Sequence, residues 1–282
     1  MRGFFAVTAV MAGALALAAV PARGAEATFE RTLTVSGTVD LTVITGSGSI
    51  QLTSGTDNRI HILGRVRSNW GWGGDEARVR EIAAHPPIEQ TGNIVRIGEH
   101  NENLRNVSIS YQIEAPAGAY LDVTSGSGSV TDNGVGTDAR LHTGSGNIHA
   151  ISLKGGYSLS TGSGSIEAEG TGGGDVTART GSGTIDLRGV NGALQAHTGS
   201  GGIKVQGKPS GPWRIGTGSG DVELSTGDAG FALDAGTGSG GIHVDRQMTV
   251  QGSIGHHHVT GQIGGGGPTV RIRTGSGGIQ LH

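Results

Sequence analysis

The chain has 282 residues, of which 56 are glycine and none is cysteine. So much glycine excludes an ordinary helical protein, because each glycine inside a helix costs about 1 kcal/mol relative to alanine. Collagen is excluded as well, since glycine does not recur at every third position and only 7 residues are proline. The 20 basic and 23 acidic residues form no block of like charge, so a nucleic-acid partner is not expected. Without cysteine there are no disulfides and no thiolate sites.

Residues 1–24 have the pattern of a secretory signal peptide. Met1 and Arg2 begin the chain, the segment 4–20 is almost wholly apolar, and small residues flank Arg23. A retained membrane anchor is the alternative, but it needs nearer to about 20 apolar residues. Cleavage would lower the basic count from 20 to 18 against 23 acidic residues, a net charge of −5. With no integral membrane segment expected after cleavage, we predict export to the periplasm, the cell surface or the medium.

One six-residue motif recurs: Thr-Gly-Ser-Gly, a small residue, then Ile or Val. Its first residues are Thr45, Ser125, Thr143, Thr161, Thr180, Thr198, Thr217, Thr237 and Thr274. From Ser125 onward the spacings are 18, 18, 19, 18, 19, 20 and 37 residues. We assign the last, doubled spacing to a degenerate copy at residues 254–259. A nearly constant period of this length indicates a solenoid of stacked coils.

Apolar and polar residues alternate on both sides of each Gly-Ser-Gly. In one repeat the apolar positions are Leu194 and Ala196 before the motif and Ile203 and Val205 after it. Alternation with a period of two is typical of half-buried strands. Each repeat is therefore predicted to be two short strands joined at a Gly-Ser-Gly corner, with coils stacked about 4.8 Å apart over one continuous core. We predict an all-β fold, a single-chain β-helix or β-solenoid, with coils of 18–20 residues.

Residues 51–120 interrupt this regularity. The segments 59–66 and 107–113 read as strands, and between them 75–84 predicts a short helix that Pro86 and Pro87 end. We interpret the region as an elaborated coil with one short helical excursion, inside a single solenoid domain at 25–282. A separate small domain is the alternative.

The recurrent Thr-Gly-Ser-Gly-x-Ile motif and three short blocks resemble the DUF4097 family. The blocks are Gly64-Arg65-Val66-Arg67, Pro86-Pro87-Ile88 and Gly92-Asn93. The family is described as bacterial β-strand-repeat proteins with an adhesin label, and the resemblance covers about residues 28–282. It implies a β-helical fold in the cell envelope. It transfers no catalytic residues, because the family has no established chemistry.

The polar position six residues after each motif start forms an outward column. The column comprises Thr131, His149, Glu167, Asp186, Lys204, Glu223 and His243. Its members Glu167, Asp186, Lys204 and Glu223 are candidate surface contacts. Polysaccharide-cleaving β-helix enzymes use such stripes, but retaining hydrolysis needs two carboxyls about 5 Å apart in a pocket, and no walled cleft is predicted. A carbohydrate-contacting surface is a second interpretation. A solvated face of mixed charge is the favoured one.

Two further clusters are candidate sites. Trp70 and Trp72 in the excursion are candidate carbohydrate or protein contacts, although a cover for an open part of the core is favoured. The run of histidines at 256–258 would place at most two side chains on one face of a strand, and no carboxylate completes a metal site. We expect no cofactor and no metal.

These observations predict a secreted or cell-envelope solenoid with a surface-presentation, adhesin-like role and no catalysis. A carbohydrate-binding module is the alternative, and a polysaccharide-cleaving enzyme a less favoured one. The expected partner is an envelope glycan or protein. Because nothing follows the strand at 278–281 to cover the final coil, its edges would face water. We therefore predict end-to-end association with a second copy or a membrane-bound partner, unless Arg271, Arg273 and His282 discourage it.

Overall fold

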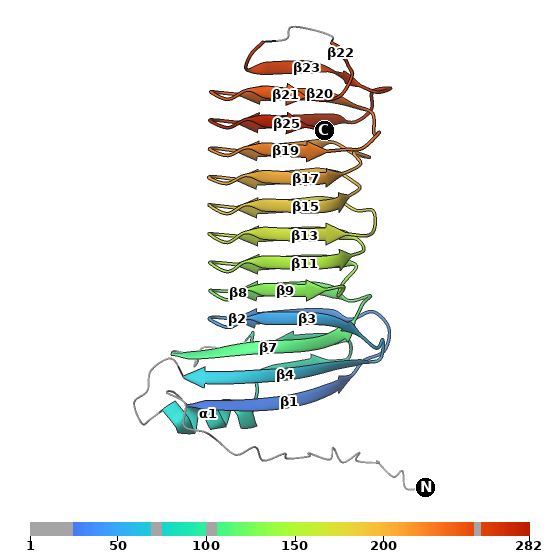
Figure 1. Cartoon of the computed structure of the whole chain (residues 1–282). Coiled ribbons are helices and arrows are strands. Elements are labelled where there is room, and N and C mark those ends of the chain that lie inside the picture. The colour runs from blue at the N-terminus through green and yellow to red at the C-terminus, as the bar shows by residue number, and fades with distance from the viewer. Residues whose placement is uncertain (1–24, 69–74, 100–105, 251–254) are drawn as a thin grey trace.

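Figure 1 shows a computed structural model of the chain, which describes residues 25–68, 75–99, 106–250 and 255–282. The predicted signal peptide at 1–24 lies outside the described residues, as do Trp70 and Trp72. Within the described ranges, no helix is long and apolar enough to cross a membrane.

The chain is a stack of coils between two long sheets (Figure 1). Sheet A contains, in spatial order, β1 (Glu26–Thr34), β4 (Arg59–Ser68), β7 (Val107–Pro116), β3 (Ile50–Gly55), β9 (Val130–Asn133), β11 (Ile148–Leu153), β13 (Ile166–Gly170), β15 (Ile185–Val190), β17 (Ile203–Gly207), β19 (Val222–Ser225), β25 (Ile279–Leu281) and β21 (Ile242–Val244). Sheet B contains β22 (Met248–Val250), β23 (His258–Ile263), β20 (Phe231–Thr237), β24 (Thr269–Thr274), β18 (Trp213–Thr217), β16 (Leu194–Thr198), β14 (Val176–Thr180), β12 (Gly156–Thr161), β10 (Asp138–Thr143), β8 (Tyr120–Ser125), β2 (Asp40–Thr45), β6 (Ile94–Ile97) and β5 (Ile88–Thr91). The helix α1 spans Asp75–Ala84.

The predicted all-β solenoid with one short helix is confirmed. Consecutive coils pair in parallel, so equivalent residues stack: Ile185 lies beside Ile203 in sheet A, and Leu194 lies beside Trp213 in sheet B. These four side chains are at most 2% exposed. Each buried aliphatic side chain of this kind contributes roughly 1.5–3 kcal/mol, and the core between the sheets is one continuous cluster.

The Gly-Ser-Gly corners require glycine because neighbouring coils approach closely. A Cβ atom built on Gly146 would lie 2.1 Å from the carbonyl oxygen of Gly128 in the previous coil. The φ angle of Gly146 is outside the left-handed region. Close backbone packing, rather than a special backbone conformation, therefore explains this glycine.

The elaborated region at 51–120 covers the N-terminal end of the stack (Figure 1). β7 pairs with β3, and β4 and β1 follow it as antiparallel strands. The hairpin β5–β6 extends sheet B beyond β2. The helix α1 lies against β1 and β4 with Val79 buried. At this end of the stack, both sheets therefore finish with antiparallel strands.

The final coil does not lie at the end of the stack, and the prediction of an uncovered final coil is wrong. β24 pairs with β18 on one side and β20 on the other, and β25 lies between β19 and β21. After β21 the chain forms the antiparallel pair β22–β23 beyond β20 and then returns. The proposed degenerate copy at 254–259 is therefore also wrong: the part described, from residue 255, leads into an antiparallel strand. Self-association through an open final coil loses its structural basis.

Candidate functional site

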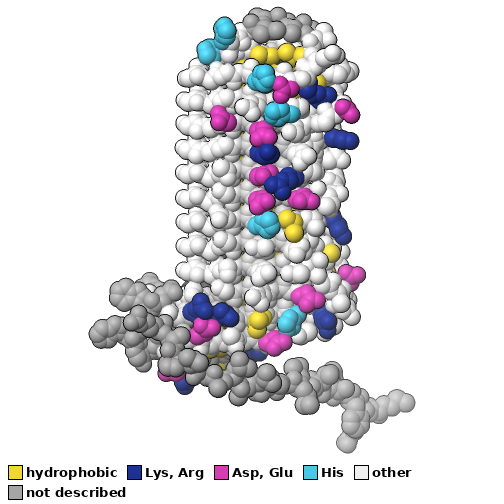
Figure 2. Space-filling view, in the orientation of Figure 1, with side chains coloured by type: hydrophobic (Ala, Val, Ile, Leu, Met, Phe, Trp, Pro, Cys, Tyr) yellow, Lys and Arg dark blue, Asp and Glu magenta, His cyan; other side chains and the backbone are white. Residues whose placement is uncertain are grey.

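The predicted outward column lies on the outer face of sheet A, where Figure 2 shows a line of charged and histidine side chains along the stack. Glu167 lies beside Asp186, Asp186 beside Lys204, and Lys204 beside Glu223, as the register predicts. One neighbour differs. The inserted final coil places Gln280 between Glu223 and His243.

The carboxylates of this column are held by cations. Arg188 Nη2 is 2.9 Å from Asp186 Oδ2 and 3.7 Å from Glu167 Oε1, and Lys204 Nζ is 2.8 Å from Glu223 Oε1. The hydrogen bond to Asp186 raises the pKa of the Arg188 guanidinium. Oppositely charged side chains are thus paired along this exposed face, which is the arrangement of a solvated face of mixed charge.

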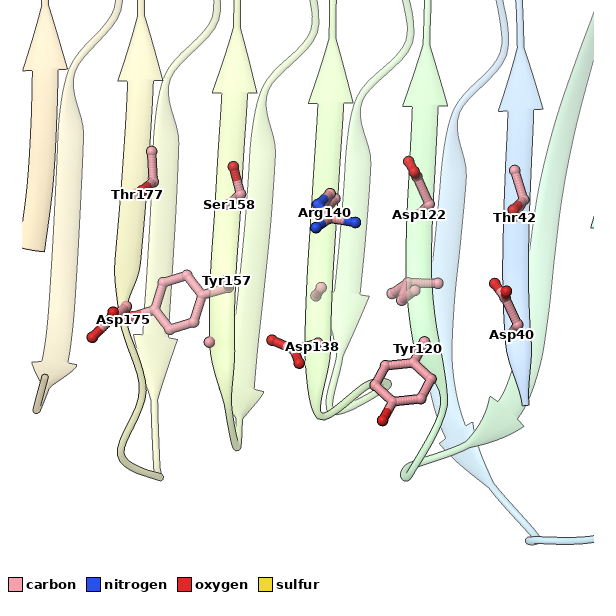
Figure 3. A pocket seen from close by; sticks show the side chains of 13 residues that line it. Asp40, Thr42, Tyr120, Asp122, Asp138, Arg140, Tyr157, Ser158, Asp175 and Thr177 are labelled. Atoms are coloured by element: carbon pink, nitrogen blue, oxygen red, sulfur yellow. The ribbon is translucent and has the colours of Figure 1, made fainter. Parts of the chain in front are cut away.

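A second polar surface, on the outer face of sheet B, was missed in the sequence. The signal for it was present, because the same alternation places outward residues five, three and one positions before each motif. The predicted outward column follows the motif, whereas these residues precede it. Figure 3 shows the groove that these residues line toward the N-terminal end of sheet B.

The groove contains Tyr120, the most exposed of the large apolar side chains that the structure describes, at 53%. Tyr120 on β8 lies between Asp40 on β2 and Asp138 on β10. One step along the strands, Asp122 lies beside Arg140. The groove has a volume of about 880 Å³, and Ser158, Asp175 and Thr177 continue its lining.

This arrangement combines an aromatic face with polar groups held on rigid strands. An exposed tyrosine ring offers an apolar face on which a sugar ring can stack. The flanking carboxylates accept hydrogen bonds from hydroxyl groups, and Arg140 donates them. At Gly156 a Cβ atom would lie 3.1 Å from Asp138 Oδ1, so glycine keeps this part of the groove open.

One carboxyl lies inside the core. Asp132 occupies an inward position beside Leu52 and Ala150 and is fully buried. Its Oδ1 accepts a hydrogen bond from the backbone N–H of Val135 at 3.0 Å, whereas Oδ2 has no partner among the described residues. Burial raises the pKa of this carboxyl to about 7, against the opposing effect of that hydrogen bond. Asp132 is sealed from any ligand and affects stability instead.

The histidine run is divided among different contacts. His258 Nε2 is 3.1 Å from Asp234 Oδ1, and His257 Nδ1 is 3.0 Å from the carbonyl oxygen of Gly240. Across the part of the chain that the structure describes, no three His, Asp or Glu side chains are grouped so that they could hold a metal ion.

Fold and surfaces together define a parallel β-solenoid with polar outer faces. The chain belongs to the DUF4097 family: the family model described as Toastrack DUF4097 matches residues 57–282. Among solved structures, the chain is similar to one from Clostridium sporogenes described as a "putative cell adhesion protein". The two share 13% identity with a TM-score of 0.28, over 90% of this chain and 99% of the other. None of the curated proteins matches this chain.

Proposed function

We propose that the protein is exported to the cell envelope, where it acts as an adhesin-like contact protein that binds a glycan without catalysing a reaction. The groove around Tyr120 is the contact surface in this proposal. The observation that carries it is the exposed Tyr120 ring between Asp40 and Asp138. The hydrophobic pattern of residues 1–24 supports export.

The rigidity of the fold favours such a role. The groove residues stand on adjacent parallel strands, and the side chains beneath them are buried in the core, Leu121 at 3% and Val123 at 0% exposure. A preformed surface loses little conformational freedom when it binds a ligand. A shallow groove also leaves an extended polymer free to continue in both directions.

The rival function is cleavage of a polysaccharide on the outer face of sheet A. The ion pairs of Glu167, Asp186 and Glu223 favour a solvated face over this function. It remains the second candidate because the carboxylates Glu167 and Asp186 do stand on adjacent strands.

The decisive experiment measures binding and turnover on the same glycans. Immobilised neutral and envelope-derived polysaccharides are incubated with the wild type and with Tyr120→Ala, and bound protein and released reducing ends are both quantified. We expect saturable binding that Tyr120→Ala weakens about tenfold, without product release. Leu63→Ala, at an exposed apolar side chain of sheet A, is the matched control.

Binding that survives in Tyr120→Ala contradicts the groove as the contact surface. Release of product that Glu167→Gln or Asp186→Asn abolishes would instead establish the rival function.

A further inference from the structure

The other end of the same outer face, toward β24, carries a cluster of cationic side chains. Arg179 on β14 and Arg214 on β18 belong to coils that are separated by the coil of β16, whereas Arg271 and Arg273 come from the inserted coil. The insertion places Arg271 directly beside Arg214 and Arg273 directly beside Gly216. Residues distant in the sequence thus meet on one surface.

The cluster surrounds a hollow at Gly216. In the column that crosses it, Arg179 lies beside His197, His197 beside Gly216, and Gly216 beside Arg273. Because Gly216 has no side chain, the column is interrupted between His197 and Arg273. The hollow has a volume of about 360 Å³, and no acidic residue is among the described residues that line it.

One carboxylate borders the cluster and neutralises part of it. Asp234 Oδ2 is 2.9 Å from Arg271 Nε, and Asp234 Oδ1 is 2.7 Å from Arg273 Nη2. Partial burial acts to raise the pKa of Asp234, but hydrogen bonds from Arg273, His258 and Arg271 outweigh it and lower the pKa to about 2. Asp234 is therefore committed to these partners.

The remaining positive charge is not balanced. Arg214 is exposed and makes no ion pair with any residue that the structure describes, and Arg179 donates a hydrogen bond to the neutral amide of Gln195 at 2.9 Å. Like charges on neighbouring strands repel each other, so an anion in the hollow would relieve an unfavourable arrangement.

We propose that this hollow, defined by Arg179, His197, Arg214, Gly216 and Arg273, is a binding site for an anionic polysaccharide. Guanidinium groups suit carboxylate, sulfate and phosphate oxygens because their planar donors can bind two oxygens at once. The column of Arg179, His197, Gly216 and Arg273 crosses four adjacent strands, which span about 14 Å at the usual strand spacing. A polymer with repeated anionic groups contacts more of this length than a free ion does.

The opposite end of the face argues against an anionic membrane as the ligand. There Asp40, Asp122, Asp138 and Asp175 line the groove of Figure 3. A flat anionic surface laid over sheet B would meet these carboxylates as well as the arginines, whereas a polymer chain can cross the cationic hollow alone. The hollow is separate from the Tyr120 groove, so an experiment can refute binding at one of the two sites without refuting binding at the other.

Calorimetric titration at low salt tests the proposal with dextran sulfate as the probe and uncharged dextran as its neutral counterpart. We expect binding of dextran sulfate only, weakened by added salt. Arg214→Gln should reduce the affinity for dextran sulfate about fivefold. Gly216→Asp fills the hollow with a negative charge and should reduce the affinity at least as much. Arg59→Gln removes an exposed arginine from sheet A and should leave binding unchanged.

Melting curves confirm that each variant is folded, and Arg214→Gln carries the test alone if Gly216→Asp is not. Equal weakening by Arg59→Gln, or unweakened binding in Arg214→Gln, overturns the proposal. Inorganic phosphate that binds as tightly as the polymer makes the ligand a free anion, and preferential binding of phosphatidylglycerol vesicles makes it a membrane. A low-salt dimer that Arg214→Gln dissociates makes the occupant a second copy. Each of these three results also overturns it.

Discussion

The hydroxyl of Thr161 donates a hydrogen bond to the carbonyl oxygen of Gly146, in the previous coil, with an Oγ1–O distance of 2.8 Å. The same hydroxyl accepts a hydrogen bond from the backbone N–H of Gly164 at 3.1 Å. Thr161 is only 3% exposed. Equivalent hydroxyl-to-carbonyl bonds recur at Thr143, Thr180, Thr198 and Thr217. The first residue of the motif therefore ties each corner to the one before it.

Replacing Thr161 with valine should lower the free energy of unfolding by about 1–3 kcal/mol, because valine keeps the shape and loses both hydrogen bonds in a buried corner. Thr161→Ser keeps the hydroxyl and should lose less. Chemical denaturation of both variants measures the difference. Thr131→Val, on the outer face of sheet A, is the control. Equal losses for Val and Ser at position 161 would refute the structural role of the hydroxyl.

The first glycine of the motif should be replaceable only where no coil lies beneath it. At Gly144 a Cβ atom would lie 2.4 Å from the carbonyl oxygen of Gly126, whereas at Gly46, in the first coil, it meets nothing within 4 Å. We expect Gly144→Ala to destabilise the protein by about 1–3 kcal/mol and Gly46→Ala to change stability by less than about 0.5 kcal/mol. Thermal unfolding of the two variants compares the same motif position in two environments.

Local alternation predicted the strands and inward columns because burial on one face leaves its period in each repeat. Ile185 beside Ile203 follows from the motif spacing alone. The spatial order of the coils does not follow from the motif spacing, because the inward and corner residues of β24 fit beside β18 and β20 equally well. The cationic hollow depends on that order, since Arg271 meets Arg214 only through the insertion. The position of the Tyr120 groove does follow from the repeat, because Tyr120, Asp122 and Arg140 occupy outward positions before the motif.

Opposite faces of one strand should respond differently to substitution. Ile203 is 2% exposed, so Ile203→Asp buries an unpaired charge and should cost about 4 kcal/mol or more. The neighbouring Lys204 side chain is 52% exposed, and its ion pair with Glu223 is solvated, so Lys204→Ala should cost less than about 1 kcal/mol. Comparable losses of melting temperature in the two variants would mean that the register is wrong.

Asp132 should contribute more to the free energy of unfolding in acid than at neutral pH. Burial raises the pKa of its carboxyl in the folded state from 3.8 to about 7, so the folded protein holds this proton more tightly than the unfolded chain. The resulting stabilisation is complete below about pH 3.8 and is lost as the pH rises through about 7.

Asp132→Asn removes this titration and retains an oxygen for the Val135 N–H. Relative to the wild type, the variant should therefore gain about 2 kcal/mol of unfolding free energy between pH 5 and pH 8. Denaturant titrations at both pH values measure the gain. Asp122→Asn, on the outer face, is the control, and a pH-independent difference for Asp132→Asn would contradict the prediction.

The inserted coil should stabilise the strands that follow β19 in the sequence. Residues Val270, Ile272, Ile279 and Leu281 of β24 and β25 are at most 1% exposed, and their strands pair on both sides. Deleting 269–282 would leave two coils facing each other without the coil between them. We expect the backbone amides of β20 and β21 to lose their protection from hydrogen exchange, because both strands lose their parallel partner.

The same experiment distinguishes an inserted coil from a terminal one. A terminal coil would leave the pairing of β20 and β21 intact, and their amides would exchange in the truncated protein as slowly as in the full chain. Ile272→Ala provides the milder variant: a buried isoleucine reduced to alanine should cost about 2–5 kcal/mol and speed exchange in β18 and β20 together. Thr269→Ala, at an exposed position of β24, should leave exchange unchanged. Faster exchange in β18 alone would place the coil at an end of the stack.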